Sequence, residues 1–145
     1  MLNKNDSVEK RLQVLLRRYN DGEWEEVVKE ATKLIKKFPS VLDTYNLLGA
    51  TFHKLENFSG SLESYKVGLI IQPKQRDVYN NLGNTLISMS KDKHALCSFQ
   101  KATILDPKFA QGFFNIGICK NRRSVKGYHK GQFITRFRIN HFLFF

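Results

Sequence analysis

The sequence predicts an all-α fold, a short solenoid made of stacked pairs of antiparallel helices. Three observations support it: a repeat with a period of 34 residues, apolar residues at helical spacing within each repeat, and a proline at the end of each repeat. The period is clearest between 42–75 and 76–109, which share eleven identical residues. Such similarity between two consecutive segments indicates one helical hairpin per repeat.

We place the repeats at about 8–41, 42–75 and 76–109, with the start of a fourth at residue 110. In each repeat the apolar residues recur three and four positions apart, which marks one face of a helix, and proline stops the second helix. The predicted buried stripes of the second and third repeats are Tyr45, Leu48, Phe52 and Leu55; Leu62, Tyr65, Leu69 and Ile70; Tyr79, Leu82, Leu86 and Met89; and Leu96, Phe99 and Ile104.

Gly49 and Gly83 occupy the same position in the two repeats, next to a leucine that we expect to be buried. A glycine inside a helix costs about 1 kcal/mol relative to alanine, so its return at a fixed period requires a packing reason. Small residues at Ser61 and Ala95 provide a matching surface on the second helix. We therefore expect close contact between the two helices at these glycines, with large rings filling the remaining gaps.

The order Tyr-x2-Leu-Gly-x2-Phe, a small residue, an aromatic residue and proline within 34 residues resembles the tetratricopeptide repeat. The match is strong in 42–75 and 76–109. The resemblance implies a right-handed superhelix in which the first helix of each pair lines a concave surface. In this family such surfaces bind peptides or partner proteins.

The first repeat matches the pattern less well. Pro39 keeps its place, but Leu15 stands where the glycine is expected and Val27 where the small residue is expected. Terminal repeats are commonly atypical because one of their faces has no neighbour, so we interpret this unit as an N-terminal cap. Its predicted stripes are Leu12, Leu15, Leu16 and Tyr19, followed by Trp24, Val27, Val28, Ala31, Leu34 and Ile35.

A fourth repeat begins at residue 110 and then loses the pattern. Residues 113–117 fit the first helix, but Lys120 occupies a column that is apolar in the earlier repeats. The later columns fall on His129, Phe133, Arg136 and His141, of which only Phe133 suits its place. We divide the chain into a solenoid at 1–119 and a basic, aromatic segment at 120–145, which has seven lysines and arginines and no acidic residue. This segment is a degenerate cap, an interaction tail, or a replaced or shortened continuation.

The candidate partner-binding residues lie on the face of each first helix opposite its buried stripe. Asparagine dominates them, and its amide can hydrogen-bond an extended peptide backbone whatever the side chains of that peptide are. Asn81 and Asn115 match the asparagine ladder of O-linked N-acetylglucosamine transferases, whereas asparagines at 46 and 80 replace the lysines of a chaperone-tail clamp. The predicted set is Asp43, Asn46, Ala50, His53, Asp77, Asn80, Asn81, Asn84 and Asn115.

Nothing in the sequence forms a recognisable catalytic group, so we expect no enzyme activity, no metal and no cofactor. A nucleophile requires a nearby base and a metal requires converging ligands, and the four histidines are scattered and are expected to be solvated. Cys97 and Cys119 have no metal-binding spacing. The absence of an apolar leader or a long apolar run leads us to expect a cytoplasmic protein without a transmembrane segment.

The leading hypothesis is a protein-interaction scaffold that binds a peptide or a partner domain in the concave groove. The alternative is a regulatory N-terminal lobe of a larger transferase, because residues 79–84 are similar to repeats that precede glycosyltransferase or sulfotransferase domains. A lesser alternative is that the basic tail contacts nucleic acid or an anionic membrane, which the apolar ending 142–145 disfavours. Self-association through the same tail is a further expectation.

Overall fold

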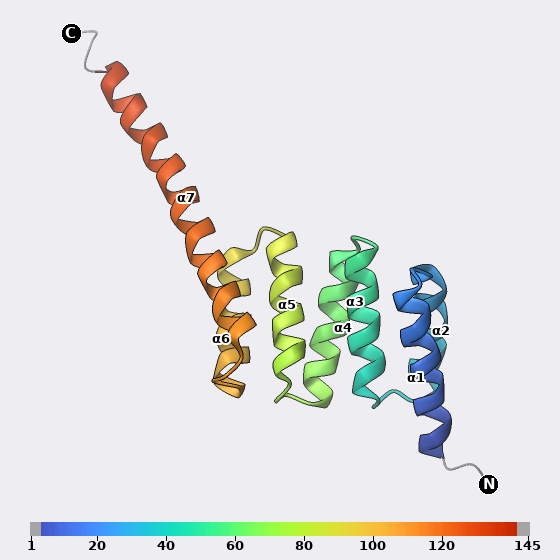
Figure 1. The fold of residues 1–145 in the computed structure, drawn as a ribbon. Helices are drawn as coiled ribbons and strands as arrows, with labels where there is room; N and C mark the ends of the chain where they lie inside the picture. Colours follow the sequence, from blue (N-terminus) through green and yellow to red (C-terminus); the bar gives the residue numbers. More distant parts are fainter. Residues whose placement is uncertain (1–3, 142–145) are drawn as a thin grey trace.

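The computed structural model describes residues 4–141 of the chain, and the side chains of residues 7–125. All regular elements in this range are α-helices, as predicted (Figure 1). They are α1 (Lys4–Asn20), α2 (Trp24–Lys37), α3 (Leu42–Lys54), α4 (Phe58–Ile71), α5 (Arg76–Ser88), α6 (Asp92–Leu105) and α7 (Ala110–His141).

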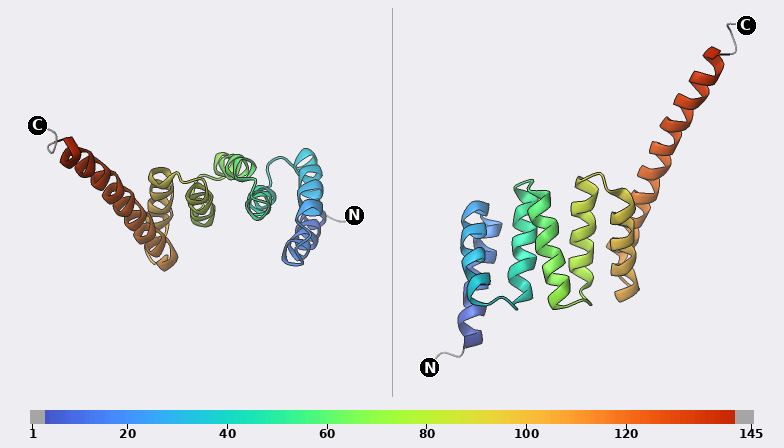
Figure 2. Two further views of the ribbon diagram at one scale, coloured as in Figure 1. Left: turned by 90° about the horizontal axis from the view of Figure 1, so that it is seen from above. Right: turned by 180° about the vertical axis from the view of Figure 1, so that it is seen from behind.

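The helices form a right-handed α-solenoid of antiparallel hairpins, α1–α2, α3–α4 and α5–α6, followed by α7. Seen from above, the helices lie in two layers, with α1, α3, α5 and α7 in one layer and α2, α4 and α6 in the other (Figure 2). The row is bent into a shallow arch, and the first helix of each hairpin lies on its inner side. None of the described helices is long and apolar enough to cross a membrane.

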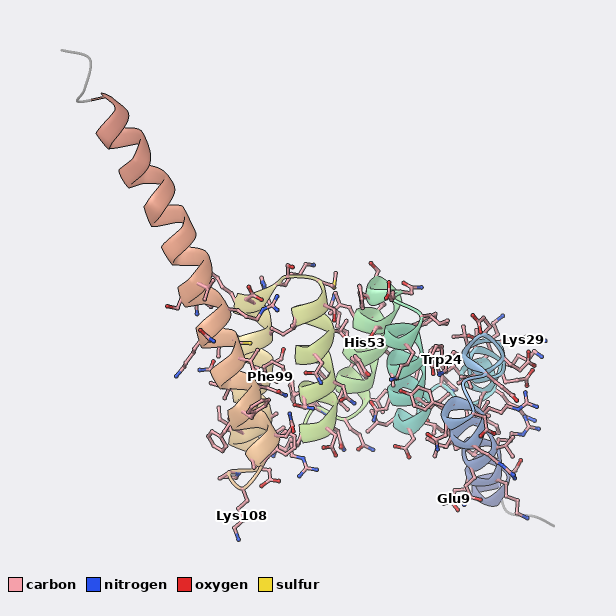
Figure 3. All side chains as sticks on the ribbon, turned by 45° about the horizontal axis from the view of Figure 1, so that its top comes forward. Glu9, Trp24, Lys29, His53, Phe99 and Lys108 are labelled. Atoms are coloured by element: carbon pink, nitrogen blue, oxygen red, sulfur yellow. The ribbon has the colours of Figure 1, made fainter. Side chains whose placement is uncertain are left out.

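The repeated glycines allow the two helices of a hairpin to touch, as the sequence predicts. A Cβ built on Gly49 would lie 2.7 Å from Cε1 of the Tyr65 ring, and a Cβ on Gly83 would overlap the Phe99 ring. Figure 3 labels Phe99 on α6, where its side chain is almost wholly buried. The aromatic residue that follows the small residue by one helical turn therefore covers the glycine in both hairpins.

The N-terminal hairpin is held together differently because Leu15 and Val27 replace the small residues. Both side chains are buried, in one apolar cluster with Ala31 and Leu34. The indole Nε1 of Trp24, labelled in Figure 3, donates a hydrogen bond of 3.1 Å to the backbone oxygen of Tyr19. This bond fastens the turn between α1 and α2.

Three residues of the predicted stripes are exposed instead. Ile70 and Ile104 have exposed fractions of 79% and 76%, and Leu16 is also largely exposed. Each isoleucine follows the buried ring of its helix by five positions, which is about 140° around the helix, so it points away from the first helix. Leu16 directly follows the buried Leu15, about 100° away. The prediction was wrong for these three because the predicted stripes included residues that lie beside the buried face of the helix rather than on it.

α7 continues as one helix to His141 and runs away from the other helices (Figure 1). In the two preceding repeats the turn contains a residue with positive φ, Glu56 or Ser90, both at 56°. The residue 34 positions after Ser90 is Ser124, which is helical in α7. The first part of α7 packs against α6, where Arg122 Nε lies 3.1 Å from Oδ1 of the buried Asp92.

Candidate peptide-binding groove

A cavity of about 190 Å³ lies on the inner side of the arch, between the first helices of three hairpins. Tyr19 of α1 borders one side and Asn81 and Asn84 of α5 border the other. α3 contributes Ala50, His53 and Lys54 between them, and Tyr65 reaches the cavity from α4. Four of the predicted residues, Ala50, His53, Asn81 and Asn84, therefore lie together at one site.

A chain of hydrogen bonds behind this cavity joins α3, α4 and α5. The hydroxyl of Thr85, which is fully buried, lies 3.1 Å from His53 Nδ1 and 3.0 Å from Ser61 Oγ, and it donates to the Asn81 backbone oxygen. Because that hydroxyl has one proton, its lone pairs remain to accept from Ser61 and from His53. We therefore assign the Nδ1–H tautomer to His53, which leaves its Nε2 as an acceptor.

His53 is the histidine for which the expectation of a solvated side chain was wrong. His53, labelled in Figure 3, is half-buried. Its ring meets the Phe58 ring edge-on, with 5.4 Å between the centroids. Burial, and to a smaller extent the positive charge of Lys54, lower the pKa of His53. His94 is exposed as expected, and the side chains of residues 129 and 141 lie outside the described ones.

The predicted asparagines divide into two groups. Asn115 Nδ2 donates a 2.9 Å hydrogen bond to Asn80 Oδ1, and Gln111 Nε2 donates to Asn115 Oδ1. Asn115 is only 6% exposed, so its amide links α7 to α5 inside the protein. The amides of Asn81 and Asn84 have no hydrogen-bond partner within the described part of the chain, which leaves them available at the cavity.

The other predicted residues lie away from the cavity. Asp43 and Asp77 are exposed, and Asp77 is paired with the adjacent Arg76. Asn46 is half-buried, and its Oδ1 is enclosed with no hydrogen-bond donor among the described residues. The structure thus brings the predicted residues of the middle of α3 and α5 together and separates those at the helix starts.

Sequence reasoning missed three residues that belong to this side of the arch. Tyr19 lines the cavity, although the sequence suggested only a buried stripe for it. Phe114 follows the column of Asn46 and Asn80, and Ile118 follows that of Ala50 and Asn84, and both are exposed. The 34-residue offset could have identified Phe114 and Ile118. These two residues make the C-terminal end of the inner face apolar.

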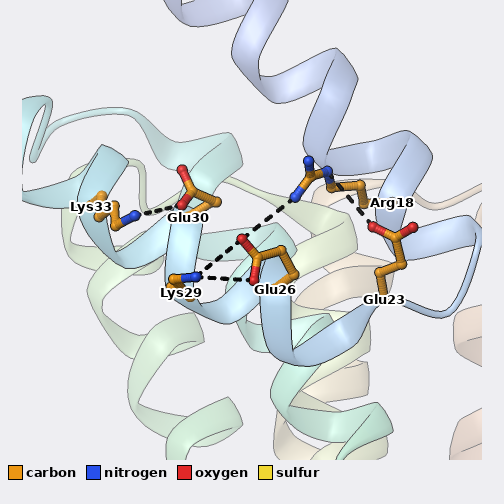
Figure 4. Close-up of polar contacts among 6 residues, drawn as sticks. All are labelled: Arg18, Glu23, Glu26, Lys29, Glu30 and Lys33. Atoms are coloured by element: carbon orange, nitrogen blue, oxygen red, sulfur yellow. Dashed lines mark hydrogen bonds and ion pairs between the residues drawn. The ribbon is translucent and has the colours of Figure 1, made fainter.

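A larger cavity, of about 530 Å³, lies between α1 and α2, away from the predicted residues. Ion pairs occupy its rim: Glu26 lies 3.7 Å from Arg18 and 3.3 Å from Lys29, and Lys33 lies 2.6 Å from Glu30 (Figure 4). These charges are paired with each other, whereas Lys10 and Arg11, which also line the cavity, have no ion pair among the described residues. The smaller cavity is the better candidate site because it brings four predicted residues together beside two free amides.

Chemical groups suited to catalysis or metal binding are sparse among the described residues. No group of three or more histidine, cysteine, aspartate or glutamate side chains within the described range could hold a metal ion. Cys97 is exposed and Cys119 is buried, and burial raises the pKa of the Cys119 thiol.

No family model and no curated protein matches this sequence. Solved structures do match: the first TPR domain of Spaghetti (RPAP3), bound to the HSP90 peptide SRMEEVD, superposes with a TM-score of 0.77 at 11% identity, covering 81% of this chain and 93% of that one. The chain has the tetratricopeptide-repeat fold. At this identity the likeness extends to the fold alone.

Two further matching structures belong to proteins of other kinds. The type III secretion translocator chaperone SycD of Yersinia enterocolitica matches with a TM-score of 0.78 and 16% identity, over 84% of this chain and 89% of that one. An O-GlcNAc transferase of Thermobaculum terrenum matches with a TM-score of 0.74 and 15% identity, over 82% of this chain but 23% of the transferase.

Proposed function

We propose that this protein is an interaction scaffold that holds an extended segment of a partner protein along the inner face of its arch. The observation that carries the proposal is the cavity of about 190 Å³ where α1, α3 and α5 meet, with the amides of Asn81 and Asn84 unpaired beside it. Solved structures of the same fold include one bound to a peptide, which supports a peptide as the ligand class.

The chemistry of this surface favours recognition of a peptide backbone. An asparagine amide has two donor hydrogens and one acceptor oxygen, so Asn81 and Asn84 can pair with both the N–H and the C=O groups of an extended chain. The cavity beside them admits a side chain of the ligand. Asn46 and Asn80 stand where the chaperone-tail clamp has lysines, so we expect an internal segment rather than a terminal carboxylate to bind.

Site-specific photo-crosslinking tests the proposal. A photoreactive amino acid is placed at Ala50, which lines the cavity, or at Glu63, which is exposed on α4 in the outer layer. In cell extract we expect residue 50 to label a defined partner segment that mass spectrometry identifies, and residue 63 to give no such product. A synthetic peptide of that segment then provides the ligand for affinity measurements.

The double variant Asn81→Ala/Asn84→Ala decides whether the amides contribute. We expect it to weaken binding of that peptide about 10-fold or more, since two hydrogen bonds contribute roughly 1 kcal/mol each. The control is Asn20→Ala/Asn121→Ala, which removes two exposed amides outside the cavity. Equal affinities for the two double variants would show that the amides of Asn81 and Asn84 do not contribute to binding. Asn80 is left intact because its replacement would remove the hydrogen-bond acceptor of the buried Asn115 amide.

A second candidate function is that of an N-terminal lobe in a larger transferase. The match to the O-GlcNAc transferase favours it, because that enzyme contains a region of this fold as a minor part of its length. The test is the coding DNA beyond residue 120, read in all three frames. A resumed repeat followed by a catalytic domain supports the lobe, and the absence of both in every frame overturns it.

A further inference from the structure

Gly117 is the third glycine of the repeat, and it lacks the cover that the other two have. Gly49 lies under the Tyr65 ring and Gly83 under the Phe99 ring, whereas a Cβ on Gly117 would meet nothing within 4 Å. The face of α7 that contains Gly117 corresponds to the faces of α3 and α5 that pack against a second helix. Within the described side chains, this face of α7 is uncovered.

In the structure the chain's own continuation does not cover this face, because α7 runs on as one helix to His141. The 34-residue offset puts Phe133 in the ring column of Tyr65 and Phe99, but it also puts His129 in the column of the buried Ser61 and Ala95, and Arg136 in the column of the buried Gly68 and Ala102. A second helix built from this segment would therefore force a histidine ring into a closed contact and enclose a guanidinium charge, which are both unfavourable. The face is therefore open to another polypeptide.

Phe113 supplies the complementary shape on the same helix. Its side chain is 53% exposed, and it precedes Gly117 by four residues, which places the two on one face of α7. Aromatic rings cover Gly49 and Gly83, and Phe113 is a ring with no cover of its own. One helix face therefore contains both an open glycine and an exposed ring, which is the condition for a self-complementary, two-fold interface.

We propose that a second copy of this chain docks on α7, with the two α7 helices antiparallel and Phe113 of each copy covering the partner's Gly117. In an antiparallel pair whose two-fold axis lies at the level of residue 115, position 113 of one helix faces position 117 of the other. Both gaps are then filled by one symmetric contact. The interface uses a different face from the groove, so it does not depend on the proposed peptide binding.

The net charge of the chain makes a specific prediction about this dimer. Each copy has a formal net charge of +11, so two copies repel each other as they associate. Salt screens this repulsion, so the association should strengthen as ionic strength rises. Contacts to nucleic acid would weaken with salt instead. One helix per copy makes a small interface, so we expect a dissociation constant on the order of 100 µM.

Sedimentation equilibrium of the full chain over about 10 µM to 1 mM, a range set around that affinity, measures the association. We expect the mean mass to rise from 16.9 kDa toward twice that value. Phe113→Ala and Gly117→Leu should each weaken dimerisation more than 10-fold. Phe114→Ala is the matched control. The Phe114 side chain is 64% exposed on the neighbouring face of α7, and its loss should change the dissociation constant less than about 2-fold.

A swap of the two residues tests the antiparallel register itself. In Phe113→Gly/Gly117→Phe the ring and the gap exchange places, and only an antiparallel two-fold pair brings them opposite each other again, so dimerisation should return. Circular dichroism checks that helicity is kept. A monomer throughout the range, equal effects of the Phe113 and Phe114 variants, a dimer that persists in Phe113→Ala, or a swap that stays monomeric would each overturn the proposal.

Discussion

The ring of Tyr65 lies directly against the backbone of Gly49, where an added Cβ would be 2.7 Å from ring carbon Cε1. Tyr65 is almost fully buried, and burial raises the pKa of its phenol far above the ordinary value. The contact joins the two helices of the central hairpin over a single residue. Its geometry explains why the same position is glycine again in the next repeat.

Gly49→Ala should therefore destabilise the protein. The methyl group would overlap the Tyr65 ring, and overpacking of this kind costs roughly 1–3 kcal/mol, more than the gain of about 1 kcal/mol in helix propensity. Gly117→Ala is the control, because a Cβ there meets nothing within 4 Å. Urea denaturation is measured at a protein concentration of about 1 µM, well below the expected dissociation constant of the dimer. The free energy of unfolding should fall for Gly49→Ala and rise slightly for Gly117→Ala. Losses in both variants would refute this account.

Most of this fold can be predicted from the sequence because two consecutive repeats contain the same kinds of packing residues. A glycine, a small residue and a ring at fixed offsets predict close contact between α3 and α4 and between α5 and α6, but they do not predict that the ring itself lies on the glycine. Ile70 and Ile104 were misassigned because apolar character alone does not give the angle around a helix. The straight course of α7 past residue 124 was also not predictable, since a lost turn signal does not say what replaces the turn.

The candidate site was less predictable than the fold. The inner face can be identified as the helix face opposite the buried stripe. This rule selected Ala50, His53, Asn81 and Asn84, which the structure places at one cavity. It does not reveal which polar groups bond to each other, and so the burial of Asn115 against Asn80 became visible only in the structure. The contribution of Tyr19 comes from an atypical repeat, where the column alignment gives no guidance.

Thr85→Val should cost more stability than Thr51→Val, the matched change one repeat earlier. Both side chains are fully buried. The Thr51 hydroxyl bonds only to the backbone of its own helix, whereas the Thr85 hydroxyl also contacts His53 and Ser61. Its removal takes the partner from His53 Nδ1 and one of the two contacts from Ser61, at about 1–3 kcal/mol. Thermal denaturation of both variants measures the difference, and equal losses would mean that the links between helices contribute nothing.

Arg122→Gln should expose Cys119. The guanidinium of Arg122 holds α7 against the start of α6 through Asp92, which is buried. Cys119 has no exposed surface in this arrangement, so its alkylation requires local opening, whose frequency rises when the contact is lost. Iodoacetamide labelling followed by mass spectrometry should show several-fold faster modification. Arg123→Gln, at an exposed neighbour, is the control, and the exposed Cys97 is the internal reference. Equal Cys119 rates in both variants would contradict the contact.

The lowered pKa of His53 predicts that the protein loses stability as the pH falls. Burial, with a smaller contribution from Lys54, disfavours the charged ring in the folded state, whereas in the unfolded chain the pKa is about 6.5. The unfolded chain therefore binds more protons below about pH 7, and acidification favours unfolding. Between about pH 7.5 and 5.5 the urea midpoint should fall further for the native protein than for His53→Asn, whose amide nitrogen takes the place of Nδ1 and can still donate to Thr85 but does not titrate. The other histidines are present in both chains, so they cancel in the comparison. An equal fall in both proteins would show that His53 titrates as a solvated histidine does.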